Sequence, residues 1–225
     1  SSCHGPNFRR NGSPPCPRSI RPDLEWLKGK IREYDLLMLQ LELRMDTITT
    51  AARIAHEAGV PVMLNPAPAA ALSDELLSCL TYVSPNEHEA ALLSGLSLKA
   101  DEHGVDQKDL AAVVQNLCSR GIKKLMITLG SNGAVLCDER DWIQIPCVHM
   151  TEVKDPTAAG DSFVGAFCTG IAGGLSEKEA LQMAAYTAAI TVSGMGAMPS
   201  LPTLDRVCEL MKERGAQELA EKVMN

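Results

Sequence analysis

The sequence predicts an α/β fold in which helices cover a mostly parallel β-sheet. From Asp23 onward, short apolar runs of β type alternate with longer segments of helical period, which is the pattern of a parallel sheet covered by helices. Polar residues follow the ends of these runs, at the places where parallel sheets bind ligands. With 225 residues, of which 45% are hydrophobic, the chain has the size and composition of one globular domain.

Each expected element is assigned from its pattern. Strands are short apolar runs such as YDLLMLQLE, VPVMLN and KKLMITLG, whereas helices are longer amphipathic stretches such as DLEWLKGKIRE. The runs GAVLCD and WIQIPC follow one another closely and are expected to form hairpin-like strands, and Gly215 is expected to break the last helix. In chain order, the expected elements are helix 23–33, strand 34–42, helix 46–58, strand 60–65, strand 81–85, helix 86–94, helix 106–120, strand 123–130, strands 133–138 and 142–147, and helices 160–173, 176–193 and 203–223.

The N-terminal 22 residues differ in composition from the rest of the chain. They hold five prolines and four arginines with no acidic residue, whereas the remaining 203 residues hold 17 basic and 28 acidic residues. The segment has neither the apolar core of a secretory signal nor the amphipathic helix of a transit peptide. We therefore expect residues 1–22 to be an unstructured or foreign leader, and residues 23–225 to be the α/β domain.

Charge and composition exclude several classes of partner. The net charge is -7 and only 4% of residues are aromatic, which disfavours nucleic acid and anionic membranes as partners and favours a small ligand. No apolar run reaches the roughly 18 to 20 residues of a membrane helix. The eight cysteines form no Cys-x-x-Cys pair, which fits a protein of the reducing cytoplasm.

Polar residues follow five of the expected strands and are expected to meet at one edge of the sheet. They are Glu42, Asn65, the segment 86–89, the segment 128–130 and the segment 155–161.

The segment DPTAAGDSF at 155–163 carries the strongest chemical signal. Its small residues open an apolar helix, and the first-turn N–H groups of a helix have no partners within it, so they can bind an anion. Asp161 at this position can accept a proton from an attacking hydroxyl while those N–H groups hold developing charge, as phosphoryl transfer requires. The alternative is that Asp161 or Ser162 caps the helix and the alanines only allow close packing. The chain has neither a Gly-x-x-x-x-Gly-Lys-Ser/Thr loop nor a Gly-x-Gly-x-x-Gly motif.

This segment resembles the Asp-Thr-x-Gly-Ala-Gly-Asp signature of the ribokinase, or phosphofructokinase-B, family of carbohydrate kinases. The motifs LLMLQLE, LNPAPA, SPNEHEAALLSG, ITLGSNGA, DPTAAGDSFVGAF and GAMPS occur in the order found in that family. The resemblance covers the chain from about Pro22 to its C-terminus. It implies a three-layer α/β/α fold with a mostly parallel sheet, truncated at the N-terminus.

The resemblance assigns a role to each matching residue. It implies that Asp161 is the catalytic base, that Ala159, Gly160 and Asp161 form a backbone anion hole, and that Glu42 binds the sugar. The implied ATP-binding residues are Asn65, Asn86, Thr128, Gly130, Ser131, Gly133, Ala159 and Gly160. Glu89 is implied to hold Mg²⁺ through water, and the implied site of an activating K⁺ comprises Asp155, Thr157, Thr191, Gly194, Gly196 and Ser200.

Each of these assignments has a purely structural alternative. Glu89 opens a helix, where acidic residues are favoured in any case. Glu42 would otherwise be a solvent-facing strand end, and the loop 128–133 would otherwise be an ordinary turn between strands.

The chain departs from the family pattern in two ways. Pro156 replaces a threonine and Ala158 replaces a glycine, and alanine is strained wherever a positive φ is needed. The Gly-Gly-Lys-x-x-Asn sugar motif and the β-lid through which the family usually forms homodimers do not occur in the sequence.

The implied function is ATP-dependent phosphorylation of D-ribose to ribose 5-phosphate. Two alternatives stay open: a truncated, non-catalytic nucleotide-binding fragment, and a kinase for another sugar or a nucleoside.

Overall fold

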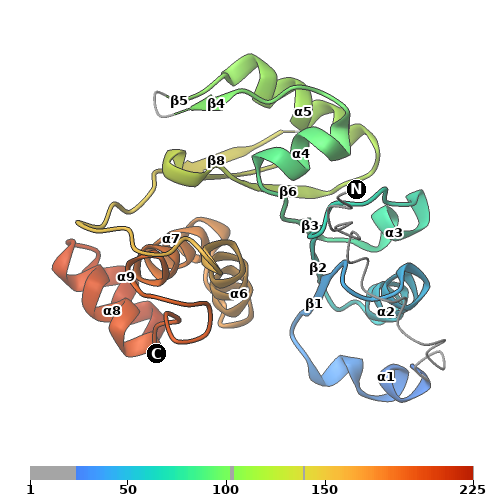
Figure 1. Cartoon of the computed structure of the whole chain (residues 1–225). Coiled ribbons are helices and arrows are strands. Elements are labelled where there is room, and N and C mark those ends of the chain that lie inside the picture. The colour runs from blue at the N-terminus through green and yellow to red at the C-terminus, as the bar shows by residue number, and fades with distance from the viewer. Residues whose placement is uncertain (1–23, 102–103, 139, 225) are drawn as a thin grey trace, which may run out of the picture.

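A computed structural model describes residues 24–101, 104–138 and 140–224 of the chain (Figure 1). Its centre is a six-stranded sheet with the order β1-β2-β3-β6-β7-β8. Neighbouring strands are parallel from β1 to β6, and antiparallel from β6 to β8. This confirms the predicted α/β fold with a mostly parallel sheet. The strands are β1 (Leu37–Gln40), β2 (Val62–Asn65), β3 (Tyr82–Val83), β6 (Lys124–Thr128), β7 (Ala134–Cys137) and β8 (Trp142–Ile145).

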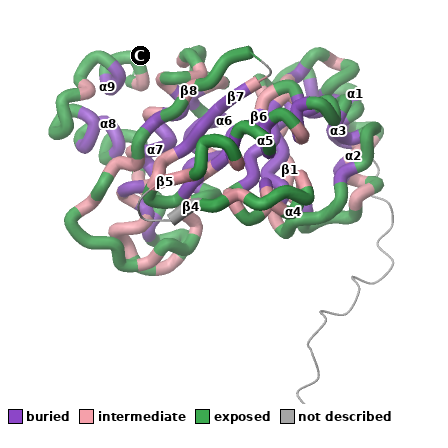
Figure 2. The backbone as a smooth tube through the Cα atoms, turned by 90° about the horizontal axis from the view of Figure 1, so that it is seen from above, coloured by how far each residue is buried: buried purple, intermediate pink, exposed green. Residues whose placement is uncertain are grey.

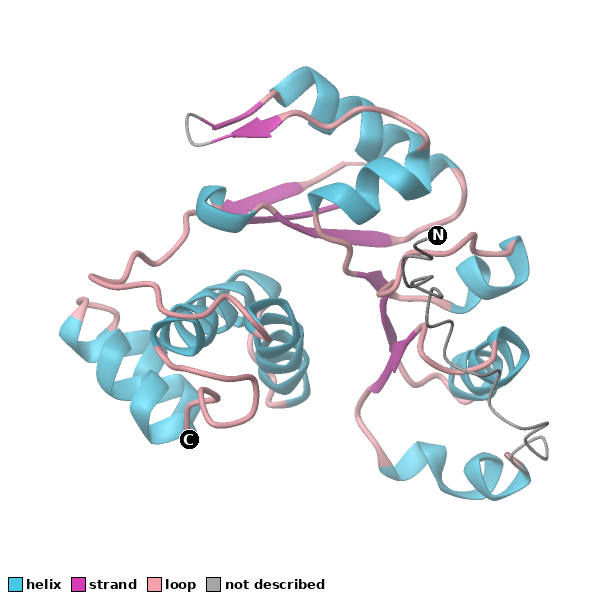
Figure 3. Cartoon of the chain, in the orientation of Figure 1, coloured by secondary structure: helices cyan, strands magenta, loops and turns pink. Residues whose placement is uncertain are grey.

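Helices cover both faces of the sheet (Figures 1 and 3). One face packs against α1 (Glu25–Lys30), α2 (Met45–Glu57), α3 (Asp74–Cys79), α4 (Glu87–Ser94) and α5 (Gln107–Ser119). The other face packs against α6 (Ala159–Ala172) and α7 (Glu177–Ser193). The last helices, α8 (Leu204–Glu213) and α9 (Gln217–Met224), pack on the outer side of α7.

The alternation of side chains along each strand divides the core into two layers. Met63 and Met126 belong to the core with α6 and α7, whereas Leu64 and Ile127, one residue further along, belong to the core on the opposite face. Successive side chains of a strand point to opposite faces, so strands buried on both faces must be apolar at every position. Figure 2 shows buried segments running along β6 and β7 between the two helical layers.

Several element boundaries differ from the sequence-based expectation. The helix expected over 23–33 is split into α1 and the 3-10 helix η1 (Ile31–Glu33), and the strand expected over 34–42 is only β1. Helix α3 and a small hairpin, β4 (Ala100–Asp101) with β5 (Gly104–Val105), were not expected. The predicted break at Gly215 is confirmed, because this residue lies between α8 and α9 with φ 83°. The predicted leader at 1–22 lies outside the described residues.

Two further expectations concern cysteines and membrane helices. The six cysteines among the described residues form no disulfide bond with one another, and Cys118 and Cys168 are buried, as small apolar side chains often are. In the part of the chain that the structure describes, no helix combines the length and the apolar character needed to cross a membrane.

Candidate active site

Backbone pairing brings the ends of four strands into one line. Gln40 pairs with Asn65 at the ends of β1 and β2. On the other side of β3, Asn86 forms a parallel bridge with Thr128, and the N–H of Thr128 donates to the carbonyl of Pro85 at 3.1 Å. Asn65, Asn86 and Thr128 therefore lie along the carboxyl edge of the sheet, as the sequence predicted.

Helix α6 begins at this edge without a side-chain cap. Its N-cap is Ala158, with φ 62° and ψ 7°, and no side chain accepts a hydrogen bond there. Ser162 donates its Oγ hydrogen to the carbonyl of Ala159 at 2.9 Å, so the alternative reading of Asp161 or Ser162 as the helix cap is wrong. First-turn N–H groups that lack a cap are suited to an anion.

The turn before α6 contains both departures from the family signature. Ala158 is the residue with a positive φ that is not glycine among the described residues, so the alanine stands at a position that does require the left-handed conformation. The N–H of Ala159 donates to the carbonyl of Pro156 at 3.2 Å. An anion bound at 159–161 would therefore have to share the N–H of Ala159 with the carbonyl of Pro156 or displace that carbonyl. The N–H groups of Gly160 and Asp161 follow it along the chain.

Asp161 lies in the first turn of α6 with an exposed side chain. Its Oδ1 accepts a hydrogen bond from Nε2 of Gln40 at 3.1 Å, across 121 residues of sequence. Gln40 is not among the predicted site residues, because the expected strand extended to Glu42. In the structure, β1 ends at Gln40, and Glu42 is an exposed residue of the following turn. The sequence shows only that Gln40 is a polar residue within the apolar run 36–41, and it does not identify a partner for this side chain.

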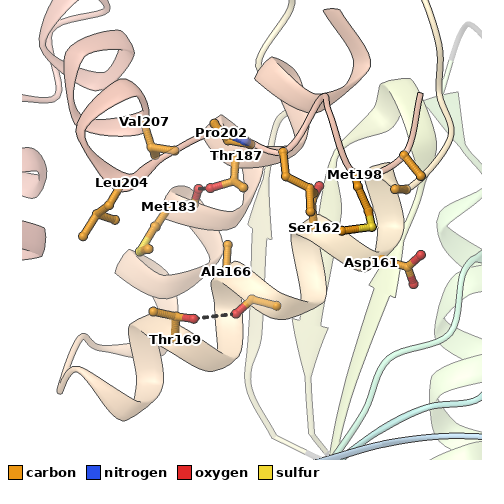
Figure 4. A pocket seen from close by; sticks show the side chains of 14 residues that line it. Asp161, Ser162, Ala166, Thr169, Met183, Thr187, Met198, Pro202, Leu204 and Val207 are labelled. Carbon is orange, nitrogen blue, oxygen red and sulfur yellow. Dashed lines mark hydrogen bonds between the residues drawn. The ribbon is translucent and has the colours of Figure 1, made fainter. Parts of the chain in front are cut away.

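A cavity of about 500 Å³ lies beside Asp161, between α6, α7, α8 and the segment that joins α7 to α8. Its lining is largely apolar and includes Ala166, Met183, Met198 and Leu204. Figure 4 shows Asp161 at one end of the cavity, with its carboxylate turned away from Met183 and Leu204. The carboxylate is thus accessible from solvent at the edge of the sheet.

Asn86 and Glu89 form a capping box at the start of α4. Oδ1 of Asn86 accepts from the N–H of Glu89 at 2.9 Å, and Oε2 of Glu89 accepts from the N–H of Asn86 at 2.9 Å. Both side chains therefore stabilise the helix terminus. Oε1 of Glu89 is the oxygen that a hydrated cation could approach without breaking this box.

The residues predicted to surround ATP in the loop 128–133 form a tight turn between β6 and β7. The N–H of Leu129 donates to the carbonyl of Gly133 at 2.8 Å. Gly133 has a φ of +86°, and a Cβ there would lie 2.1 Å from the carbonyl oxygen of Ile145, so only glycine fits. The turn carries Gly130 and Ser131, both exposed, next to Thr128 at the sheet edge.

The predicted cation-site residues are also close to one another. The carboxylate of Asp155 accepts from the N–H of Thr157 at 2.9 Å and from the N–H of Gly196 at 3.0 Å. Hydrogen bonds from the Thr157 side chain, the Thr157 N–H and the Gly196 N–H hold the pKa of Asp155 below its usual value.

The end of α7 completes this cluster. A Cβ on Gly194 would lie 2.7 Å from Cβ of Ser200, and the hydroxyl of the buried Thr191 donates to the carbonyl of Thr187 at 3.0 Å. The structure thus gathers Asp155, Thr157, Gly194, Gly196 and Ser200 around two adjoining loops, with Thr191 in the last turns of α7.

No group of three or more histidine, cysteine, aspartate or glutamate side chains suited to a metal ion occurs within the described residues. The hydroxyls and backbone carbonyls at this edge are oxygen ligands, which suit Mg²⁺ and K⁺.

Two curated proteins illustrate what the chain is similar to. A ribokinase of Schizosaccharomyces pombe is 38% identical over 179 residues, which are 79% of this chain and 55% of that protein. A ribokinase of Haemophilus influenzae is 36% identical over 185 residues, which are 82% of this chain and 58% of that protein.

A solved structure, that of Arabidopsis thaliana ribokinase complexed with ribose and ATP, matches with a TM-score of 0.78 and 30% identity, and the match covers 84% of this chain and 59% of that chain. The chain thus spans between 55% and 59% of the length of these three proteins.

Residues 25–204 match the family model described as pfkB family carbohydrate kinase. Because this model matches most of the chain, the chain belongs to the pfkB family of carbohydrate kinases, which are phosphotransferases.

Proposed function

We propose that the chain carries the phosphoryl-transfer site of an ATP-dependent sugar kinase that converts D-ribose to ribose 5-phosphate. The observation that carries this proposal is the start of α6, where an uncapped helix terminus and the exposed carboxylate of Asp161 lie together at the carboxyl edge of the sheet. The similarity to ribokinases of 36% to 38% identity supports ribose as the acceptor.

In this mechanism Asp161 is the general base. Its carboxylate takes the proton of the 5-hydroxyl of ribose, and the hydroxyl oxygen attacks the γ-phosphorus of ATP while the bond to ADP breaks. The N–H groups of Gly160 and Asp161, with that of Ala159, hold the negative charge that develops on the phosphoryl oxygens. Glu42, in the turn that follows β1, is the carboxylate that would accept hydrogen bonds from the sugar.

The nucleotide would lie along the edge formed by Asn65, Asn86, Thr128 and the turn 130–133. When bound, Mg²⁺ neutralises charge on the phosphate oxygens, and Glu89 would hold its water shell through Oε1. A K⁺ ion would be held by oxygens around Asp155 and Ser200, at the loop that leads into α6.

The test is ADP release in the presence of ribose, ATP and Mg²⁺, with the variant Asp161→Asn. The variant keeps the shape of the side chain but cannot take a proton, so turnover is expected to fall by roughly 10² to 10⁴. Asp74→Asn is the matched control, because Asp74 is also an exposed carboxylate in the first turn of a helix, α3. Turnover that survives in Asp161→Asn would show that this carboxylate is not the base.

A second candidate is a nucleotide-binding chain without turnover. It is favoured by the turn before α6, where Ala158 holds a left-handed conformation with φ 62° and the N–H of Ala159 already donates to the carbonyl of Pro156. Nucleotide binding without ribose-dependent ADP release would identify this role. Turnover with fructose 6-phosphate or adenosine but not with ribose would instead assign a different acceptor.

A further inference from the structure

Gln40 makes a long-range contact to Asp161 through one side-chain hydrogen bond. Nε2 of Gln40 donates to Oδ1 of Asp161 at 3.1 Å, and the two residues are 121 positions apart in sequence. The contact joins the last residue of β1 to the first turn of α6. It therefore connects the sheet to the helix that carries the proposed base.

The backbone of Gln40 is held by β2 and by the segment that follows β2. Gln40 pairs in parallel register with Asn65, and the N–H of the next residue, Leu41, donates to the carbonyl of Ala67 at 3.0 Å. The side-chain amide of Gln40 therefore extends from a backbone position that is held in place. The Asp161 side chain, by contrast, is exposed, and an exposed side chain samples several rotamers unless a partner selects one.

We propose that Gln40 is a positioning residue for phosphoryl transfer, which holds Oδ1 of Asp161 so that Oδ2 is presented to the acceptor hydroxyl. This inference rests on the proposed function of Asp161. A carboxylate has two oxygens that accept hydrogen bonds, so one can be held by the amide while the other takes the proton. Correct placement of a reacting group accounts for large rate effects, and a misplacement of about 1 Å can lower a rate about 100-fold.

The neutral amide suits this task better than a cation would. A lysine or arginine at this position would pair with the carboxylate and stabilise its charged form, which would make it a weaker base. A glutamine donates a hydrogen bond without adding charge. The chain can thus fix the orientation of Asp161 while leaving its charge available for proton transfer.

The first test compares kinetics of Gln40→Leu and Gln40→Glu with those of the parent chain. In Gln40→Leu the carboxylate is no longer held, so kcat is expected to fall about 10- to 100-fold with the KM for ATP within about twofold. In Gln40→Glu two carboxylates face each other and share a proton, so the pH–rate profile is expected to shift to higher pH. Gln115→Leu is the matched control, because Gln115 is exposed on α5 on the opposite face of the sheet. Unchanged kcat in Gln40→Leu, or an equal loss in the control, would overturn the proposal.

The second test does not depend on turnover. The side-chain amide signals of Gln40 in a ¹⁵N–¹H NMR spectrum are expected to move in Asp161→Ala and to stay in place in Asp74→Ala. A parent chain without ribose-dependent ADP release would refute the proposed function, and the amide signals would then decide the contact by themselves. Signals that respond to Asp161→Ala support the contact on which the positioning role depends, and signals that do not respond overturn the proposal.

Discussion

Replacing Ala158 with glycine is expected to stabilise the chain. Ala158 has φ 62° and ψ 7° at the N-cap of α6, which is the left-handed region that an L-residue with a Cβ adopts at a cost of roughly 1–2 kcal/mol. Glycine adopts it freely. The strain lies one turn before Asp161, so the substitution also tests the local geometry on which the proposed anion site depends.

The expected change in the free energy of unfolding is the sum of one gain and two losses. Relief of strain contributes about 1.5 kcal/mol, whereas the greater freedom of glycine in the unfolded chain removes about 0.7 kcal/mol. The methyl group of Ala158 is half-buried, and its loss removes about 0.4 kcal/mol. The net gain is about 0.4 kcal/mol, which corresponds to a rise in Tm of about 1–2 °C for a chain of this size.

The assay is thermal unfolding of Ala158→Gly beside Ala112→Gly. Ala112 is exposed within α5, where the same change lacks strain to relieve and is expected to cost about 1 kcal/mol. The two variants should therefore differ by about 1.4 kcal/mol, or roughly 3–6 °C in Tm. If Ala158→Gly loses as much stability as Ala112→Gly, the left-handed conformation at residue 158 is not strained and the reasoning fails.

Three further predictions concern the scaffold around the site. Phe167→Ala is expected to lower the free energy of unfolding by about 3–5 kcal/mol in urea titrations, because this ring is fully buried and lies edge-on to Tyr82 with 5.4 Å between ring centroids. Gly133→Ala is expected to lower it by on the order of 3 kcal/mol, because the new Cβ would lie 2.1 Å from a backbone oxygen at a φ of +86°; full stability would show that the turn can rearrange. The third prediction concerns pH. Hydrogen bonds from Lys222 and Ser176 lower the pKa of Glu179 to about 2. The ionised Glu179 therefore stabilises the fold above the ordinary pKa of a glutamate, and this stabilisation is lost as the pH falls toward 2. The stability difference between the parent chain and Lys222→Ala should therefore narrow as the pH falls from about 5 to about 2, and a constant difference would contradict it.

The sequence predicted most of the sheet and helices because their patterns are local. Strands buried on both faces appear as continuous apolar runs, as in VPVMLN, and long helices have a clear period. Helix α3 was missed because its six residues are too few to show a period. Its local signal was Ser73, whose side chain accepts from the N–H of Leu76 at 3.2 Å as an N-cap.

The site was predictable to the extent that its residues follow strand ends. Asn65, Asn86 and Thr128 were placed correctly at one edge, because parallel strands end together. Gln40 was not predicted, because its contact with Asp161 depends on how two distant segments pack. Sequence spacing carries no signal for such a contact.

The requirement for a left-handed residue at Ala158 was only partly predictable. The comparison with the family signature raised the possibility of strain, but the conformation follows from the turn that places Pro156 and Ala159 within hydrogen-bond distance. The backbone conformation of a loop depends on where its two ends are held as well as on its own residues.

The position of β1 at the end of the strand order affects how the chain behaves in solution. The N–H of Leu37 donates to the carbonyl of Pro61 at 2.9 Å, toward β2, so alternation turns the backbone groups of Met38 to the opposite side. No strand in the described ranges pairs with that side, and the Met38 side chain is 46% exposed. An apolar strand with an open edge invites intermolecular β-pairing. For the described part of the chain we therefore predict self-association through β1 that increases with protein concentration, and dilute samples are the appropriate ones for measuring its chemistry.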